Sequence, residues 1–388
     1  MRKKSHSLEI IKPFRLSEPP KVLFLGNGIN RLDYSDSRKI SLEQLLENLR
    51  KDLLNKEAIA QLPFPLQAQC IRLLLKDHYD NKITELCLDW CNEVIKDDKQ
   101  QLINNLLSDN SDNKFDAVIT ANYSYEIEKS LLPDVNKEFV KKEDYSIFYN
   151  KNKRSRFFDK YRNWVDEGES TKVRDILHSF LAPNDDGYSP LPLKAPYVWH
   201  FHGEAENFKH IVLDLHSYGN NLSEIQGYIS KFIRRVMISV NNNEYYKPKS
   251  WVDYFLLGEV SIIGFSFDFN EFDLWWLLDE RRKVIEILKQ RLSEKSKKNN
   301  KRININFGEV TFFDMIVQKG SSSSPHSVTN TDNNSSSDSS KNKYDSNLKE
   351  TAFSALNAKY VQIEASSFEE AYKTIPAKMK EIEKKKNK

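Results

Sequence analysis

The sequence predicts an α/β fold: a Rossmann-like parallel sheet flanked by helices, with helical insertions between the core strands. Short, continuous apolar runs of strand length recur along the chain, which is typical of strands buried on both faces of a parallel sheet. The segments between these runs carry apolar residues at helical spacing. Several runs end directly in glycine, asparagine or histidine, residues that a simple core does not need there.

Composition excludes several classes of protein. With 388 residues and 39% hydrophobic content, the chain is long enough to bury a large core. Its 59 Lys and Arg nearly balance 56 Asp and Glu, so the net charge of +3 gives no reason to expect direct nucleic-acid binding. Three cysteines without an apolar leader predict a cytoplasmic protein, and no run approaches the roughly 20 apolar residues that span a membrane.

The first part of the chain is expected to supply two core strands and a helical layer. Residues 1–20 are basic and contain three prolines, which predicts an N-terminal arm. The apolar run Lys21–Leu25 predicts the first strand, and Phe115–Thr120 predicts the second, followed by a helix from about Tyr125. Helically spaced leucines predict a helical insertion at about 41–113.

The middle of the chain is expected to extend the sheet. A charged and aromatic stretch at 136–195 predicts a second, mostly helical insertion. The runs Ala195–Phe201 and Val260–Gly264 predict core strands, and Ile211–Leu213 predicts a short one. The region 222–256 predicts helices.

The last part combines regular elements with one polar tract. A helix is expected from about 270 to 292, and the alternating segments Arg302–Phe307 and Val310–Phe313 predict strands. The Ser/Asn-rich tract 319–347 has almost no large apolar residues, which predicts a disordered insertion. Residues 348–388 are expected to return to the core with an edge strand and a helix, before a basic tail.

Two of the predicted strand ends carry loops suited to binding a nucleotide. Carboxyl ends of parallel strands meet at one edge of the sheet, where ligands bind in open α/β folds. The loop Gly26–Arg31 has two glycines that let backbone N–H groups approach a diphosphate, although a tight turn alone also explains a single G-x-G. The loop Gly264–Asp268 is expected to place Ser266 and Asp268 near a ribose; the alternative is that Asp268 or Asn270 caps the next helix.

Two further strand ends carry the candidate catalytic residues. Asn122 follows the second strand in Thr120-Ala-Asn-Tyr, where it either caps a helix or offers a carboxamide to a ribose hydroxyl or a water. His202 precedes a glycine at the end of His200-Phe-His-Gly, where an imidazole is suited to proton transfer. His200 is expected to be structural.

Taken in order, the motifs G-N-G-I-N, T-x-N-Y, H-F-H-G and G-F-S-x-D resemble those of the sirtuin-like family, and specifically its NAD hydrolases of bacterial antiphage defence. The resemblance covers the core strands from about Lys21 to Glu280, within an NAD-binding catalytic domain expected at 21–318. It implies that Asn122 and His202 are the catalytic pair. It also implies that the glycine loop binds the phosphates and ribose of NAD, and that the Gly264–Asp268 loop contacts the adenosine-side ribose. The residues implied to bind NAD are Gly26, Asn27, Gly28, Ile29, Asn30, Thr120, Gly264, Ser266 and Asp268.

Two departures separate the chain from sirtuins that deacetylate proteins. Those enzymes carry a four-cysteine zinc module, and Cys70, Cys87 and Cys91 cannot form such a closed tetrahedral site, so no metal is expected. Their first loop reads G-A-G-x-S, whereas this one has Asn27 and Asn30. Hydrolysis of NAD to nicotinamide and ADP-ribose is therefore the expected activity.

The sequence leaves alternative functions open and also leads to expectations about regulation and partners. A catalytically silent module that senses NAD or ADP-ribose is the main alternative, and a deacetylase or ADP-ribosyltransferase is a further one. The resemblance implies an effector that stays inactive until a signal arrives and then depletes NAD in abortive infection. A homo-oligomer is expected, with a companion ATPase or a phage-derived activator as the candidate partner.

Overall fold

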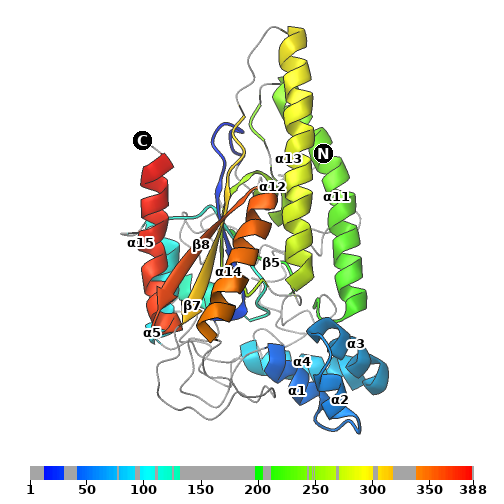
Figure 1. Ribbon diagram of the computed structural model, residues 1–388. Coiled ribbons are helices and arrows are strands. Elements are labelled where there is room, and N and C mark those ends of the chain that lie inside the picture. Colours follow the sequence, from blue (N-terminus) through cyan, green and yellow to red (C-terminus); the bar gives the residue numbers. More distant parts are fainter. Residues whose placement is uncertain are drawn as a thin grey trace, which may run out of the picture.

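Six parallel strands form the centre of the molecule (Figure 1). The computed structural model describes residues 13–29, 42–76, 78–91, 97–109, 112–124, 126–131, 197–203, 211–242, 244–246, 248, 250–267, 271–299, 305–317 and 338–386. The strand order is β5-β4-β1-β6-β7-β8, and each neighbouring pair is parallel. The predicted fold class, a Rossmann-like parallel sheet flanked by helices with helical insertions, is confirmed.

The core strands are short apolar segments close to their predicted positions. Their bounds are β1 Lys21–Leu25, β4 Ala117–Thr120, β5 Tyr197–His200, β6 Glu259–Ile263, β7 Val310–Val317 and β8 Ala358–Ala365. Four residues of β1 are buried, because helices cover the sheet on both faces. β8 lies at the edge of the sheet, as predicted for that strand.

Helices cover the two faces of the sheet separately. Phe24 of β1 belongs to an apolar cluster that also contains residues of α11 (Leu215–Asn242), α12 (Trp251–Leu257), α13 (Phe272–Asn299) and α14 (Asp338–Ala355). Leu23, its neighbour in the strand, packs on the opposite face with α5 (Asp97–Leu107), α6 (Glu126–Leu131) and α15 (Phe368–Lys386). Successive side chains of a strand point to opposite faces, so the apolar residues of one strand contribute to the cores on both faces of the sheet.

A third apolar cluster joins four helices to the end of the sheet. It contains residues of α1 (Leu42–Arg50), α2 (Lys56–Ala60), α3 (Phe64–Leu75) and α4 (His78–Cys91). Figure 1 shows this group at the end of the sheet to which the arrows of β7 and β8 point. Tyr123, which follows β4, is buried in the same cluster. Helices α1 to α4 of the predicted insertion therefore lie beside the carboxyl edge of the sheet, whereas α5 packs on one of its faces.

Smaller features complete the described chain. A two-stranded hairpin pairs β2 (Ser108–Asp109) with β3 (Asp112–Asn113). In the N-terminal arm, Phe14 forms an isolated bridge with Tyr246, and Leu16 is buried in the core. Among the described helices, none is both long and apolar enough to cross a membrane.

Three details differ from the sequence predictions. Ile211–Leu213 is not a strand: it runs as irregular chain, with Ile211 and Leu213 in the third cluster and Val212 also buried. Residues 305–307 of the predicted strand Arg302–Phe307 are also irregular, and β7 begins only at Val310. Alternation and apolarity are shared by strands and by buried loops, so they cannot separate the two.

The polar tract also ends earlier than predicted. Residues 338–347, expected within a disordered insertion, form the first half of α14. Phe353 in the second half of this helix is fully buried, and a docked helix extends at low cost into neighbouring polar turns. The rest of that tract, the helical insertion predicted at 136–195 and residues 1–12 of the arm lie outside the described residues.

A buried carboxylate ties two of the covering helices together. Asp253, fully buried in the first turn of α12, accepts hydrogen bonds from the hydroxyls of Tyr228 and Tyr246, the latter at 2.6 Å. It also pairs with Arg235 of α11 at 2.9 Å and accepts the N–H of Ser250 at 3.0 Å, closing a capping box. Burial and this carboxylate raise the pKa of both tyrosines, so they remain neutral donors.

Candidate functional site

The carboxyl ends of four adjacent strands form one row. In the strand registers, Leu25 at the end of β1 pairs with Thr120 on one side and Ile263 on the other, and Thr120 pairs with His200. Contact continues past the strand ends, since the N–H of Phe201 donates to the carbonyl of Thr120 at 3.0 Å. The four motif segments therefore lie side by side at one edge of the sheet.

The glycines of the first and fourth motifs pack directly on one another. The N–H of Gly26 donates to the carbonyl of Ile263, and the N–H of Gly28 donates to that of Gly264, both at 2.8 Å. A Cβ on Gly26 would lie 2.4 Å from the Gly264 carbonyl oxygen, and Gly264 has a φ of +78°. Close approach therefore requires glycine here. These two N–H groups bond within the protein, so a diphosphate at this loop needs other donors.

Substitution of Gly26 gives a direct test of this packing. Gly26→Ala is expected to lower the free energy of unfolding by about 1–3 kcal/mol, because the new methyl group meets backbone atoms that cannot rotate away. Gly219→Ala in α11 is the matched control, since its added Cβ would meet no atom within 4 Å beyond the neighbouring backbone of its own helix. That control is expected to be neutral or stabilising by up to about 1 kcal/mol. Equal urea midpoints for the two variants would contradict the close approach.

The carboxamide of Asn122 is buried without a partner. The residue is only 3% exposed, and neither Oδ1 nor Nδ2 has a hydrogen-bond partner among the described residues. Its backbone is fixed, since its N–H donates to Oγ1 of Thr120 at 3.1 Å. An unsatisfied buried polar group costs about 1–3 kcal/mol, so a helix-capping role does not explain this side chain. A carboxamide in this state is ready to bind a ligand.

His200 holds the Asn122 segment from the neighbouring strand. Its Nδ1 lies 2.6 Å from the backbone carbonyl of Asn122, and a carbonyl oxygen only accepts, so Nδ1 donates. The chain then turns at Gly203, which has a φ of +87° and donates its N–H to the carbonyl of His200 at 3.0 Å. These contacts fix where Asn122 and His202 emerge from the sheet.

His202 is paired with an aspartate that the sequence motifs did not single out. Its Nε2 lies 2.6 Å from Oδ2 of Asp273, in the first turn of α13. Both residues are buried, at 8% and 2% exposure. A helix N-terminus favours a negative charge, which stabilises the carboxylate at this position. The fold thus brings a fixed imidazole to the same edge as Asn122.

Aromatic rings enclose this imidazole. The ring of Phe201 lies 3.8 Å from that of His202 between centroids, and the ring of Tyr218 meets it edge-on at 5.3 Å. Burial, together with the charge of Asp273, holds the pKa of the Tyr218 hydroxyl well above its usual range, so this phenol stays neutral. The rings restrict the orientation of the imidazole and shield its pair with Asp273 from water.

The fourth motif forms a strained loop. Phe267 has a φ of +51°, which is unusual for a bulky residue. Its ring meets the stacked rings of Phe312 and Phe353 edge-on, at centroid distances of 4.7 and 4.8 Å, and its N–H donates to the carboxylate of Glu271. The same carboxylate accepts Oγ of Ser266 at 3.2 Å. Strain held in place by packing in this way is typical of ligand-binding loops.

A second carboxylate lies next to the Asn122 segment. Glu126, the first residue of α6, is 4% exposed, and its Oε1 accepts the hydroxyl of Ser124 at 2.5 Å. Its Oε2 has no hydrogen-bond partner among the described residues. The sequence reasoning missed both Glu126 and Asp273, because an acidic residue in the first turn of a helix is ordinarily explained as a stabilising end residue. Two predicted site residues, Asn30 and Asp268, lie outside the described residues.

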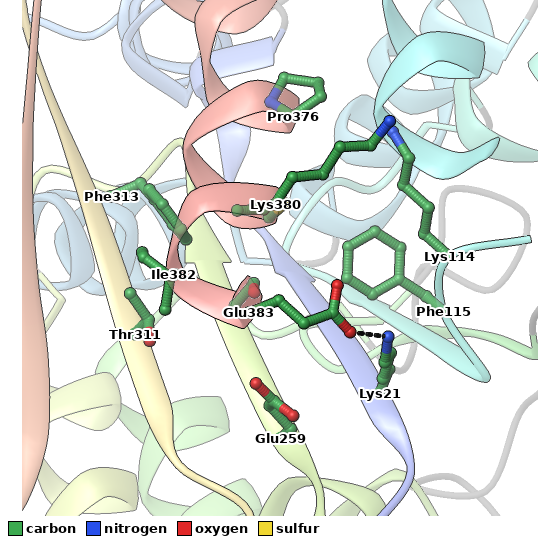
Figure 2. Close-up of a pocket in the computed structure, with 12 residues that line it drawn as sticks. Lys21, Lys114, Phe115, Glu259, Thr311, Phe313, Pro376, Lys380, Ile382 and Glu383 are labelled. Atoms are coloured by element: carbon green, nitrogen blue, oxygen red, sulfur yellow. Dashed lines mark hydrogen bonds and ion pairs between the residues drawn. The ribbon is translucent and has the colours of Figure 1, made fainter. Parts of the chain in front are cut away.

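A cavity of about 200 Å³ lies at the opposite edge of the sheet, beneath the C-terminal half of α15 (Figure 2). Lys21 and Glu259, two of its lining residues, are the first residues of β1 and β6. Lys21 is paired with Glu383 of α15. None of the four motifs contributes to its lining. We therefore place the candidate site at the carboxyl edge, on Asn122 and the His202–Asp273 pair.

Two further findings bear on this site. Within the described part of the chain, no three histidine, cysteine or acidic residues are grouped so that they could hold a metal ion. In comparisons with known proteins, no family model and no curated protein matches the chain.

Proposed function

We propose that this chain hydrolyses NAD at the bond between nicotinamide and ribose, with Asn122 and His202 as the catalytic residues. The observation that supports this most directly is the buried, unpartnered carboxamide of Asn122, on a segment that shares the carboxyl edge of the parallel sheet with the segment of a fixed imidazole, His202. The order of the four motifs along the chain, which resembles that of sirtuin-like NAD hydrolases, is the reason for choosing NAD among nucleotides.

The chemistry required by this reaction fits the two side chains. Nicotinamide carries a positive charge in NAD and leaves as a neutral molecule, so no strong acid has to protonate it. Positive charge develops on the ribose carbon, and water supplies the new C–O bond while releasing one proton. His202 is proposed to accept that proton, or one from a ribose hydroxyl. The carboxamide of Asn122 both donates and accepts hydrogen bonds, which suits it to orient the hydroxyl or the water.

The burial of these side chains favours stabilisation of a charged transition state. Asn122, His202 and the carboxylates of Glu126 and Asp273 are each less than a tenth exposed. Preorganised dipoles and charges act more strongly where water is excluded. Negative groups near the developing ribose cation would stabilise it more than the ground state, which is the requirement for catalysis.

The biological role is proposed from the resemblance of the motifs. In this proposal the chain is an effector of antiphage defence that depletes NAD after an activating signal, acting as a homo-oligomer or with a partner such as an ATPase. Expression of the wild-type chain in bacteria during phage infection should lower cellular NAD. Cells that carry His202→Gln should keep their NAD level under the same infection.

The proposed activity is tested by measuring nicotinamide and ADP-ribose released from NAD by the purified chain. His202→Gln is the informative variant, because a glutamine amide still donates to Asp273 but cannot accept a proton in catalysis. We expect kcat to fall by about 10²–10⁴-fold. His216→Ala, an exposed histidine of α11, is the control and should retain full activity.

Two outcomes would contradict this proposal. The first is that wild-type protein neither releases nicotinamide nor causes NAD loss in infected cells. The second is that His202→Gln and wild type turn over NAD at the same rate. Binding of NAD or ADP-ribose without turnover in either setting would instead support the sensing module as the function of this site.

A further inference from the structure

Asp273 contacts the candidate catalytic histidine from a distant part of the chain. It is 71 residues from His202 in sequence, and only the docking of α13 against the end of β5 brings the two together. The distance from Nε2 to Oδ2 is 2.6 Å, and the two side chains are 11% and 3% exposed. A hydrogen bond this short between buried groups fixes the imidazole far better than an exposed pair would.

The chemistry of the contact determines which ring nitrogen carries the proton. An ionised carboxylate can only accept hydrogen bonds, so Nε2 of His202 must be the donor to Asp273. In a neutral imidazole the other nitrogen, Nδ1, then holds the lone pair. No described residue forms a hydrogen bond to Nδ1 in the structure, whereas Nε2 is fully engaged.

The other contacts of His202 and Asp273 also favour the tautomer protonated at Nε2. The ring of Tyr218 lies edge-on to the imidazole at 5.3 Å, and Phe201 covers it at 3.8 Å. These rings oppose a flip of the imidazole that would exchange the two nitrogens. The second oxygen of Asp273, Oδ1, is buried without a hydrogen-bond partner among the described residues, so no second described donor binds the carboxylate through that oxygen.

We propose that Asp273 is the positioning residue of the site: it holds His202 in the tautomer protonated at Nε2 and makes Nδ1 the atom that accepts the proton during the reaction. The substrate hydroxyl or water that loses this proton therefore lies on the Nδ1 side of the ring. Asp273 also stabilises the imidazolium that forms after the transfer, as a buried carboxylate facing a newly charged ring does. Its kinetic consequence rests on the proposed hydrolysis of NAD, but the tautomer itself does not.

The tautomer is tested in the wild-type protein without substrate. Nitrogen-15 NMR of the imidazole rings distinguishes a protonated ring nitrogen from one that carries a lone pair. The signals of His202 are assigned among the eight histidines as those missing from His202→Gln. We expect Nε2 to be protonated and Nδ1 to carry the lone pair at a pH where the ring is neutral. Protonation at Nδ1 would overturn the proposal, whether or not the protein acts on NAD.

The kinetic arm uses Asp273→Asn, which keeps the size of the side chain. The amide offers a donor to Nε2 and removes the charge, so the population of the required tautomer should fall. We expect kcat to fall by about 10²–10⁴-fold with KM changed by less than about threefold. Asp279→Asn, the same substitution on the same helix at an ion pair with Arg282 and Lys283, should leave kcat unchanged.

Together, the NMR and kinetic experiments distinguish failure of the proposed function from failure of the proposed role of Asp273. If the wild type releases no nicotinamide, the proposed function fails, and the NMR result still decides the role of Asp273. If the wild type is active and Asp273→Asn keeps both its kcat and the His202 tautomer, Asp273 is merely structural and the inference is wrong. A urea midpoint for Asp273→Asn separates loss of fold from loss of positioning.

Discussion

Asn122→Leu is expected to abolish nicotinamide release while leaving the protein at least as stable as the wild type. Leucine has nearly the shape of asparagine and removes a carboxamide whose two polar atoms are buried without partners. Exchanging an unsatisfied buried polar group for an apolar one of similar shape is neutral or stabilising, by about 1 kcal/mol or more. Without the carboxamide, the reacting hydroxyl or water loses its orientation, and we expect kcat to fall by more than about 10³-fold.

The combination of these two effects is what distinguishes a functional residue from a structural one. Activity is measured as nicotinamide release and stability as the urea midpoint on the same protein preparation. Asn220→Leu, at an exposed position of α11, is the control and should change neither. If Asn122→Leu lost stability and kept its activity, Asn122 would be a structural residue, and the site would have to be assigned elsewhere.

Asp253→Ala is expected to lower the free energy of unfolding by about 3–5 kcal/mol. The substitution leaves the guanidinium of Arg235 and the hydroxyls of Tyr228 and Tyr246 without their shared acceptor inside the protein. It also removes the capping box that begins α12. Each of these groups must then be buried unpaired or the helices must separate to admit water.

Urea denaturation at neutral pH measures this loss, with the slope of the transition compared between variants. Asp279→Ala removes a half-buried carboxylate from surface ion pairs and should change stability by less than about 1 kcal/mol. If Asp253→Ala does not fold, Tyr246→Phe removes a single donor and should cost about 1 kcal/mol. Unchanged midpoints in both variants would show that this cluster does not stabilise the packing of α11 on α12.

Much of the sheet was predictable because its strands are local features. Lys21–Leu25 is a continuous apolar run flanked by charge and glycine, and it forms a strand with the predicted bounds. Parallel pairing then requires the ends of β5, β4, β1 and β6 to share an edge, so the convergence of the four motif segments was also predictable. The apolar segment Ile211–Leu213 was misread because a buried loop has the same composition as a buried strand.

The sequence by itself determined the strands at the centre of the sheet, their order along the chain, and which edge of the sheet carries the residues that follow each strand. These depend on residue type and spacing over a few positions. Only the tertiary structure decided that Asp273 meets His202, that Gly26 touches Gly264, and that the carboxamide of Asn122 is left without a partner. Such contacts join residues tens to hundreds of positions apart, and they depend on how whole helices and strands pack, which no local pattern records.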